Sequence, residues 1–171
     1  VGVLIAVPVE PTLELLNLAI EAEIPALVEK PVVYRSELLT GLLERDVPVV
    51  VGYNRRFYRT VREAREEVAR GPSVLGHLMI PESVQPPLFI SDNPQYMRPF
   101  FANSVHGLDL ARYVFDDLHV EHVQRTTNHN GVVTGIAAVL AAQHGGVVQF
   151  TANWGAPANF SLSLDRAGHR Y

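Results

Sequence analysis

The sequence contains no cysteine, and this absence removes several kinds of chemistry. Disulfides, thiolate catalysis and cysteine-ligated zinc are excluded, and a cysteine-free chain is compatible with a cytoplasmic location. No apolar stretch reaches the roughly 18 residues that a membrane-spanning helix needs. The apolar opening, residues 1–7, also lacks the basic start of a signal peptide. We therefore expect no membrane partner.

Concentrated positive charge is also lacking. The formal net charge is -4 and the pI is near 6.0, and the arginines are scattered along the chain instead of forming a basic tract. Such a chain has no electrostatic footprint for nucleic acid. The histidines show no HExxH-type spacing, so we expect no metal site. With 47% hydrophobic and 19% charged residues, the composition is that of a globular protein with a buried core.

The first third of the chain alternates between predicted strands and helices. Continuous apolar, β-branched runs are typical of parallel strands that are covered on both faces. The expected strands are Val3–Val7, Pro25–Val28 and Pro48–Tyr53. The expected helices are one with Pro11 in its first turn, ending near Glu23, and one capped by Ser36 that carries Leu38, Leu39, Leu42 and Leu43. This order predicts a right-handed parallel unit.

The remainder predicts an α+β unit with an open, mainly antiparallel sheet. A charged helix over 59–70 and a strand over 74–80 precede a proline-rich loop over 81–99, and a helix follows from about Asn103 to Phe115. Alternating segments then predict strands over 120–125, 132–141, 146–154 and 160–164. The pattern changes between Tyr53 and Tyr58, which indicates a domain boundary there.

The glycine-rich turn of a dinucleotide-binding fold is missing. Such a fold opens with a strand, a G-x-G-x-x-G turn and a helix that holds the pyrophosphate. This chain instead begins directly on a strand at Val3, and its three predicted strands would leave an apolar edge that proteins normally cover or pair. We therefore expect further residues before Val1.

The tripeptide Glu29-Lys30-Pro31 closes the predicted strand at Val28. Ligands of open α/β sheets sit beyond the carboxyl ends of parallel strands, so this position places a cation where a ligand would lie. Pro31 restricts Lys30 to an extended conformation, which limits the direction in which the lysine leaves the strand. The alternative is an ordinary strand exit with a solvated lysine.

Four motifs in order resemble the glucose-fructose oxidoreductase / inositol dehydrogenase / MocA family. They are Val3-Leu4-Ile5-Ala6-Val7-Pro8, Glu29-Lys30-Pro31, Val51-Gly52-Tyr53-Asn54-Arg55-Arg56-Phe57 and Asn103-Ser104-Val105-His106-Gly107-Leu108-Asp109. The resemblance covers nearly the whole chain. It implies a C-terminal half of a Rossmann-type dinucleotide-binding domain over residues 1–57, and an incomplete α+β substrate and oligomerisation domain over residues 58–171.

The same resemblance implies NAD(P)-dependent oxidation or reduction of a sugar, cyclitol or sugar nucleotide, with NAD or NADP bound between the two domains. It also implies a homo-oligomer that assembles through the C-terminal sheet. The implied catalytic residues are Lys30, which would stabilise the developing alkoxide, and His106, which would exchange the hydroxyl proton. The expected cofactor-binding residues are Pro8, Glu29, Lys30, Pro31, Asn54 and Arg56. The expected substrate-binding residues are Asn103, Tyr96, Arg98 and Asp109.

Several alternatives stay open at this point. Many inositol-dehydrogenase-like members carry an aspartate four residues before the histidine, where this chain has Ala102, so a single-histidine mechanism or a catalytically silent sugar-binding subunit are both allowed. Asp109 would either orient the ring of His106 or pair with Arg112 on the helix surface. Tyr96 and Arg98 would otherwise be packing and solvated charge. The fragment could also be a structural module by itself.

Overall fold

The computed structural model divides the chain into two units, Val1–Tyr53 and Asn54–Tyr171. It describes residues 1–42, 44–71, 74–82, 104–129, 131, 133–143, 145–155, 159–166 and 168–170. The short 3-10 helix η2 (Asn54–Phe57) therefore belongs to the second unit, whereas the predicted boundary placed it in the first.

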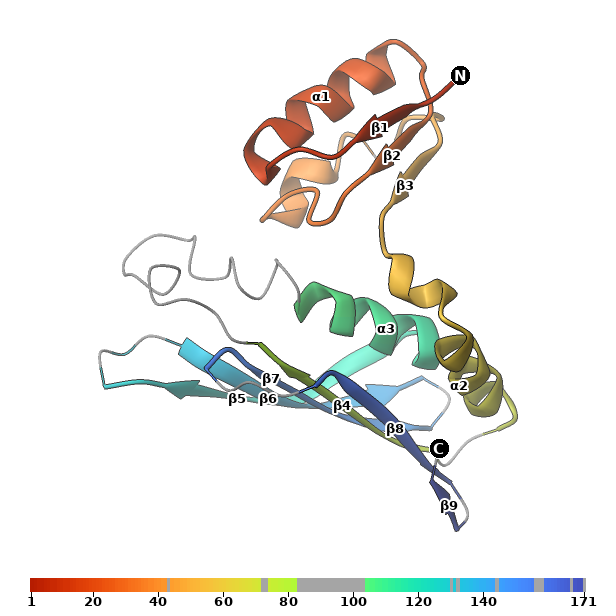
Figure 1. Ribbon diagram of the computed structural model, residues 1–171, viewed down its shortest axis with the longest axis vertical. Coiled ribbons are helices and arrows are strands. Elements are labelled where there is room, and N and C mark those ends of the chain that lie inside the picture. The colour runs from red at the N-terminus through yellow and green to blue at the C-terminus, as the bar shows by residue number, and fades with distance from the viewer. Residues whose placement is uncertain are drawn as a thin grey trace. The chain divides into compact units, whose positions relative to one another are not determined.

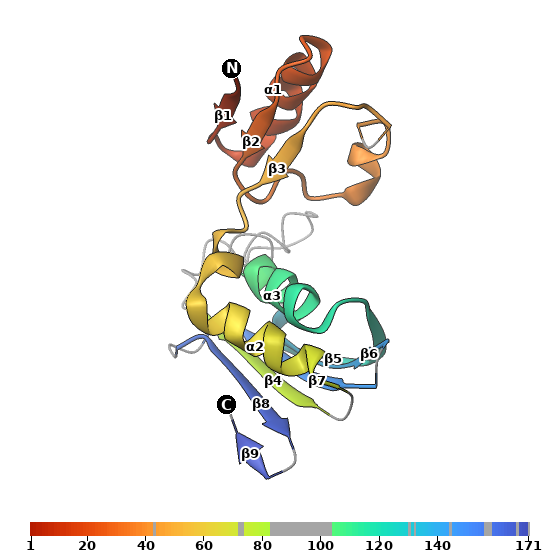
Figure 2. The same cartoon turned by 90° about the vertical axis from the view of Figure 1, so that its right-hand side faces the viewer.

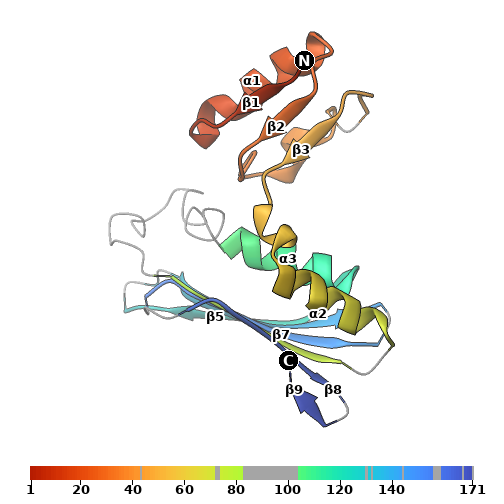
Figure 3. The ribbon, with the colours of Figure 1, turned by 45° about the vertical axis from the view of Figure 1, so that its right-hand side comes forward.

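The first unit is a parallel sheet of three short strands, as predicted. The strands β1 (Val3–Ile5), β2 (Ala26–Val28) and β3 (Val49–Val51) pair in the order β1-β2-β3. The helix α1 (Val9–Glu21) lies along this sheet, with Pro11 in its first turn (Figure 3). Its buried residues pack with those of the strands in one core: Ile5, Leu16, Ala19, Ile20, Ala26, Val28 and Val32.

The face of this sheet opposite the core is exposed, whereas the sequence predicted that both faces are covered. Leu4, Leu27 and Val50 are register partners across the three strands, and they are 65%, 45% and 59% exposed. The described residues therefore cover one face of the sheet, whereas the apolar runs predicted two covered faces. A run of apolar residues indicates that both faces of a strand can be buried. Whether both faces are buried depends on whether other segments pack against each of them.

The second predicted helix is also wrong. The structure has only the 3-10 helix η1 (Ser36–Leu39), and its N-cap is Arg35, in an extended conformation, with no side-chain cap bond. None of the η1 residues is buried, and Gly41 stands where the helix would have continued. A glycine inside a helix costs about 1 kcal/mol relative to alanine, and a helix this short needs a packed face to offset that cost. Leu43 lies outside the described residues.

The second unit is a six-stranded sheet with two helices on one face (Figures 1 and 2). The helices are α2 (Arg59–Ala69) and α3 (Val105–Phe115). The strands are β4 (Leu75–Pro81), β5 (Leu118–Thr127), β6 (Val133–Ala142), β7 (Val147–Asn153), β8 (Ser161–Arg166) and β9 (His169–Arg170). They pair in the order β5-β6-β7-β4-β8-β9, and all of these pairs except β4-β7 are antiparallel. The predicted mainly antiparallel sheet is confirmed.

The parallel pair β4-β7 lies at the centre of the sheet, and α3 packs against it. Its register runs from Leu75 opposite Val147 to Pro81 opposite Asn153, so both strands end at the same edge. Of the predicted proline-rich loop, Pro81 belongs to β4 and Glu82 follows it, and residues 83–99 lie outside the described part. Alternate residues of both strands, such as Leu78 and Val148, are buried under the helices.

Two glycines let α3 approach this sheet closely. A Cβ on Gly107 would overlap the Ile80 side chain of β4. A Cβ on Gly76 would overlap the Phe115 ring, whose Cε2 and Cε1 atoms lie only 3.0 and 3.1 Å from the position of that Cβ. The two ends of α3 therefore rest on the two ends of β4, and neither contact leaves room for a methyl group.

Gly76→Ala tests this close approach. The added methyl would force the buried Phe115 off its rotamer or lift α3, so we expect the free energy of unfolding of the second unit to fall by about 1–3 kcal/mol. Denaturant unfolding followed by the fluorescence of Trp154, the only tryptophan, measures this loss. Gly155→Ala is the control, because among the described atoms a Cβ there would meet only Asn153 Oδ1, at 3.8 Å. Equal stability of both variants would contradict the packing.

Candidate functional site

The carboxyl ends of the three parallel strands gather the predicted residues of the first unit. Ile5, Val28 and Val51 are register partners, and the ladder continues beyond them, because Glu29 N–H donates to Ile5 O (2.9 Å) and Gly52 N–H donates to Val28 O (2.8 Å). Glu29, Lys30 and Pro31 therefore leave β2 at this edge, and Pro8 follows β1 on the same side. This is the edge at which open α/β sheets bind ligands.

The side chains at this edge differ in exposure. Glu29 is exposed and Lys30 is half-buried, and the peptide bond between Lys30 and Pro31 is cis. The Glu29 carboxylate lies over Gly52, with its Oε1 3.3 Å from where a Cβ of Gly52 would stand. Lys30 is the only lysine of the chain. The edge thus combines one cation with a glycine that leaves room for the neighbouring carboxylate.

In the second unit, Arg56 and Asp109 form an ion pair that the sequence did not predict. Arg56 Nε donates to Asp109 Oδ1 (3.0 Å) and Oδ2 (2.8 Å), and Arg56 Nη2 also donates to Oδ1. The Asp109 side chain is only 5% exposed, and that of Arg56 is 41% exposed. A planar guanidinium fits a carboxylate in this way, with two or more parallel bonds. The pair ties η2, at the start of this unit, to the middle of α3.

This pair replaces both local partners expected for Asp109. Arg112, one turn further along α3, pairs instead with Asp117 at 3.6 Å, and both of those side chains are 71% exposed. Helix spacing places Asp109 beside Arg112, but the tertiary contact with Arg56 is the buried one. The roles expected for Arg56 at the cofactor and for Asp109 at the substrate stay predictions, and each charge already has an opposite charge beside it.

His106 lies in the first turn of α3 and is 6% exposed. Two residues before it, Ser104 is fully buried and is the N-cap residue, but its side chain does not cap the helix. Its hydroxyl instead donates to Glu82 Oε1 (3.0 Å) and accepts from the indole N–H of Trp154 (2.8 Å). Glu82 follows β4 and Trp154 follows β7, so the first turn of α3 is bonded to the ends of both parallel strands.

Sequence reasoning did not find Glu82 as part of this arrangement. The signal was available, because Glu82 directly follows a predicted strand, as Glu29 does. Trp154 is buried, with 2% exposure. Tyr96, Arg98, Asn103 and Ala102 lie outside the described residues.

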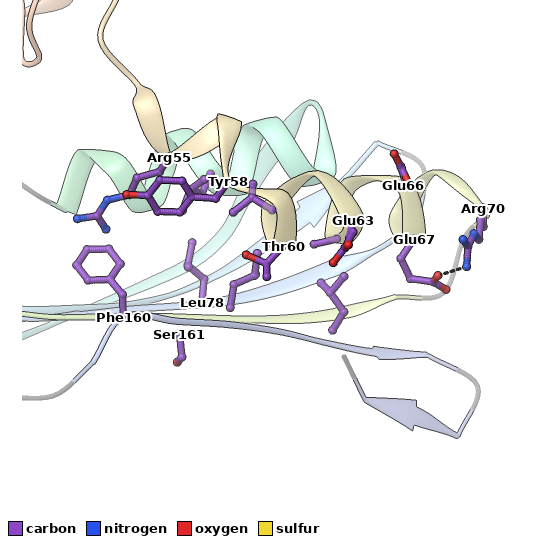
Figure 4. A pocket seen from close by; sticks show the side chains of 15 residues that line it. Arg55, Tyr58, Thr60, Glu63, Glu66, Glu67, Arg70, Leu78, Phe160 and Ser161 are labelled. Carbon is purple, nitrogen blue, oxygen red and sulfur yellow. Dashed lines mark hydrogen bonds and ion pairs between the residues drawn. The ribbon is translucent and has the colours of Figure 1, made fainter.

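A groove of about 860 Å³ runs beside α2, between that helix and the strands β4 and β8 (Figure 4). Leu78 and Phe160 line its apolar side, and the Arg55 guanidinium stacks 4.1 Å from the centre of the Phe160 ring. Charged residues of α2, including Glu63 and Glu67, form the opposite wall. Of the predicted site residues that the structure describes, none lines this groove.

On the sheet face away from the helices, charged side chains pair across strands. Asp165 accepts from Arg170 (Nε–Oδ1 2.6 Å), and His77 Nε2 lies 3.1 Å from Asp165 Oδ2. The hydrogen bond from Arg170 is the main reason why the pKa of Asp165 falls to about 2. Asp165 therefore stays charged across the ordinary pH range and holds the short edge strand β9 to β8.

Within the described ranges, no group of three or more histidine, aspartate or glutamate side chains could hold a metal ion. The described helices also include none that is long and apolar enough to cross a membrane.

Solved structures share this arrangement over almost the whole chain. A myo-inositol dehydrogenase from Corynebacterium glutamicum is 18% identical with a TM-score of 0.78, and the match covers 99% of this chain and 55% of that one. A dehydrogenase from Chromobacterium violaceum is 26% identical with a TM-score of 0.76, over 95% of this chain and 49% of that one. The chain has the fold of the glucose-fructose oxidoreductase / inositol dehydrogenase / MocA oxidoreductases. The resemblance in the four motifs is thereby confirmed for the fold.

A third similar structure is an oxidoreductase from Agrobacterium radiobacter in complex with NAD+, L-tartaric acid and magnesium. It is 16% identical with a TM-score of 0.77, and the match covers 96% of this chain and 53% of that one. The chain spans about half the length of these oxidoreductases. No protein-family model and no curated protein matches the sequence.

The Arg56–Asp109 pair predicts an asymmetry between two substitutions. Arg56→Gln leaves a buried carboxylate without its cation, so we expect the free energy of unfolding of the second unit to fall by about 1–3 kcal/mol. Asp109→Asn leaves Arg56 partly in water, so its loss should be smaller. Trp154 fluorescence during denaturant unfolding measures both.

Arg112→Gln is the matched control, because its exposed pair with Asp117 should contribute less than about 1 kcal/mol. A larger loss in Asp109→Asn than in Arg56→Gln would contradict the proposed asymmetry.

Proposed function

We propose that this protein is an NAD(P)-dependent oxidoreductase that transfers a hydride between a nicotinamide cofactor and the hydroxyl or carbonyl carbon of a sugar, cyclitol or sugar nucleotide. The observation that carries the proposal is the fold, which extends over 95% or more of the chain in similar dehydrogenases. One similar oxidoreductase was solved with NAD+ bound. The four ordered sequence motifs support the same function independently.

The residues at the carboxyl edge of the first unit fit a nicotinamide cofactor. Glu29, Lys30 and Pro31 follow β2, and Pro8 follows β1, at the edge where such sheets take their ligands. We propose that these four residues, together with Asn54 and Arg56 after β3, hold the cofactor. When bound, the nicotinamide accepts or supplies the hydride.

We propose that two side chains of this chain stabilise the charge on the substrate oxygen and transfer the hydroxyl proton. During oxidation of an alcohol, the Lys30 ammonium would stabilise the negative charge that develops on the substrate oxygen. His106 would accept the hydroxyl proton through an imidazole nitrogen, and it would return that proton when a carbonyl is reduced. We propose Asn103, Tyr96, Arg98 and Asp109 as the substrate contacts.

Cofactor binding is the first test. On titration with the full-length protein, we expect the fluorescence of NADH or NADPH to change. We also expect the bound cofactor to raise the thermal unfolding temperature of the protein. Lys30 is the only lysine of this sequence, and after reductive 13C-methylation of the full-length protein its signal is identified as the one that Lys30→Arg removes. Its NMR signal should shift when the cofactor binds. A protein that shows none of these responses with either cofactor would sink the enzyme proposal.

Turnover is the second test. With a panel of cyclitols and sugars as substrates, Lys30→Met and His106→Asn should each lower kcat/KM by roughly 100-fold or more while the variants still bind the cofactor. His122→Asn, on the exposed strand β5, is the matched histidine control. Turnover that survives both substitutions would show that Lys30 and His106 do no chemistry, which would overturn their proposed roles.

We also propose that the protein assembles into homo-oligomers through the open face of the six-stranded sheet. Met79, Val139 and Val147 lie on this face and are 47%, 36% and 40% exposed. Exposed apolar side chains on the uncovered face of a sheet favour self-association.

Val139→Asp should therefore lower the mass measured by sedimentation. Val120→Asp is the control, because Val120 pairs with Leu140 and so lies on the helix side of the sheet. A wild-type protein that sediments as a monomer would refute the assembly.

A further inference from the structure

Ser104 is a buried hydroxyl with two partners, and neither partner belongs to its own helix. It is 0% exposed and stands in helical conformation, with φ -63° and ψ -22°, at the start of α3. The indole N–H of Trp154 donates to its oxygen at 2.8 Å, and its hydroxyl donates to Glu82 Oε1 at 3.0 Å. A buried serine that is bonded on both sides in this way has one fixed rotamer.

The two partners are themselves anchored to the sheet. Glu82 N–H donates to Asn153 O (2.7 Å), at the end of β7, and Trp154 N–H donates to Thr134 O (2.9 Å) of β6. The Trp154 ring is 2% exposed within the core of the second unit. The Ser104 hydroxyl is therefore held by groups that cannot move without opening the ends of three strands.

These bonds also restrain the first turn of α3. Ser104 bonds to the strand ends, and Gly107 rests against Ile80 without room for a methyl group. His106 lies between these two points and is 6% exposed. A side chain that is enclosed on an anchored turn has few rotamers available, and an acid-base group needs its nitrogen held to within a fraction of an ångström.

We propose that Ser104 is a positioning residue that fixes His106 by bridging Trp154 and Glu82 at the carboxyl ends of β7 and β4. The proposal rests on the proposed function, because it assigns Ser104 a role through the proton exchange at His106. Ser104 touches neither substrate nor cofactor in this role. Its contribution is the direction in which the imidazole of His106 points.

The direct test is Ser104→Ala in the full-length protein. We expect kcat to fall roughly tenfold or more and its pH profile to shift, while the KM for the cofactor stays unchanged. Trp154→Phe removes the N–H and keeps an aromatic ring, and it should lower kcat in the same direction. The double variant should lose less than the sum of the two single losses, because both remove the same bridge.

Two further variants separate positioning from simple loss of stability. Glu82→Gln keeps an oxygen that accepts from Ser104 and should retain most of kcat, whereas Glu82→Ala should not. Ser161→Ala makes the same change at an exposed position of β8 and should leave kcat unchanged. Circular dichroism at the assay temperature shows whether each variant is folded.

The outcomes distinguish this proposal from the proposed function. If the wild-type protein turns over and a folded Ser104→Ala keeps kcat within about twofold with the same pH profile, the positioning role is overturned and the enzyme proposal stands. If the wild-type protein shows no turnover, the enzyme proposal fails by itself. The NMR signal of the His106 ring then decides: we expect Ser104→Ala to shift and broaden it, and an unchanged signal overturns the positioning role.

Discussion

The close approach of α3 to the parallel pair β4-β7 is the constraint on which the second unit depends. Gly107 against Ile80 and Gly76 against Phe115 fix the helix at both ends of one strand. Close packing of this kind leaves no slack, so the position of every residue on α3 follows from it. Ser104, His106 and Asp109 are thus held in place because Gly107 of the helix and Gly76 of β4 have no side chain at these two contacts.

Hydrogen bonds and an ion pair also hold α3 in place. Ser104 joins the first turn of α3 to the ends of β4 and β7, and Asp109 joins the next turn to Arg56 of η2. The bond from Trp154 to Ser104 is buried and the other two are partly buried, and buried polar groups have strict geometric requirements. The two residues that connect the helix to other segments therefore lie two positions before and three positions after the proposed proton-exchanging histidine.

Much of the fold follows from the sequence pattern, and the failures have identifiable causes. Sequence patterns located α1, α2, α3 and the strands β1 to β8 to within a few residues, whereas the two-residue strand β9 was not predicted. The helix expected after Ser36 did not form as predicted: Leu38 is exposed, Leu39 and Leu42 are only partly buried, and Gly41 interrupts the segment. The pairing of Asp109 with Arg112 failed because spacing along a helix says nothing of a cation that arrives from another segment.

The sequence by itself determined the order of the elements, the strand exit at Lys30 and the place of His106 at the start of a helix. These are local properties, since they depend on periodicity and on proline and glycine positions. Only the tertiary structure decided that Arg56 neutralises Asp109 and that Trp154 and Glu82 meet at Ser104. Those contacts join residues that lie far apart in the chain, and folding brings them together because burial leaves each polar group in need of a partner.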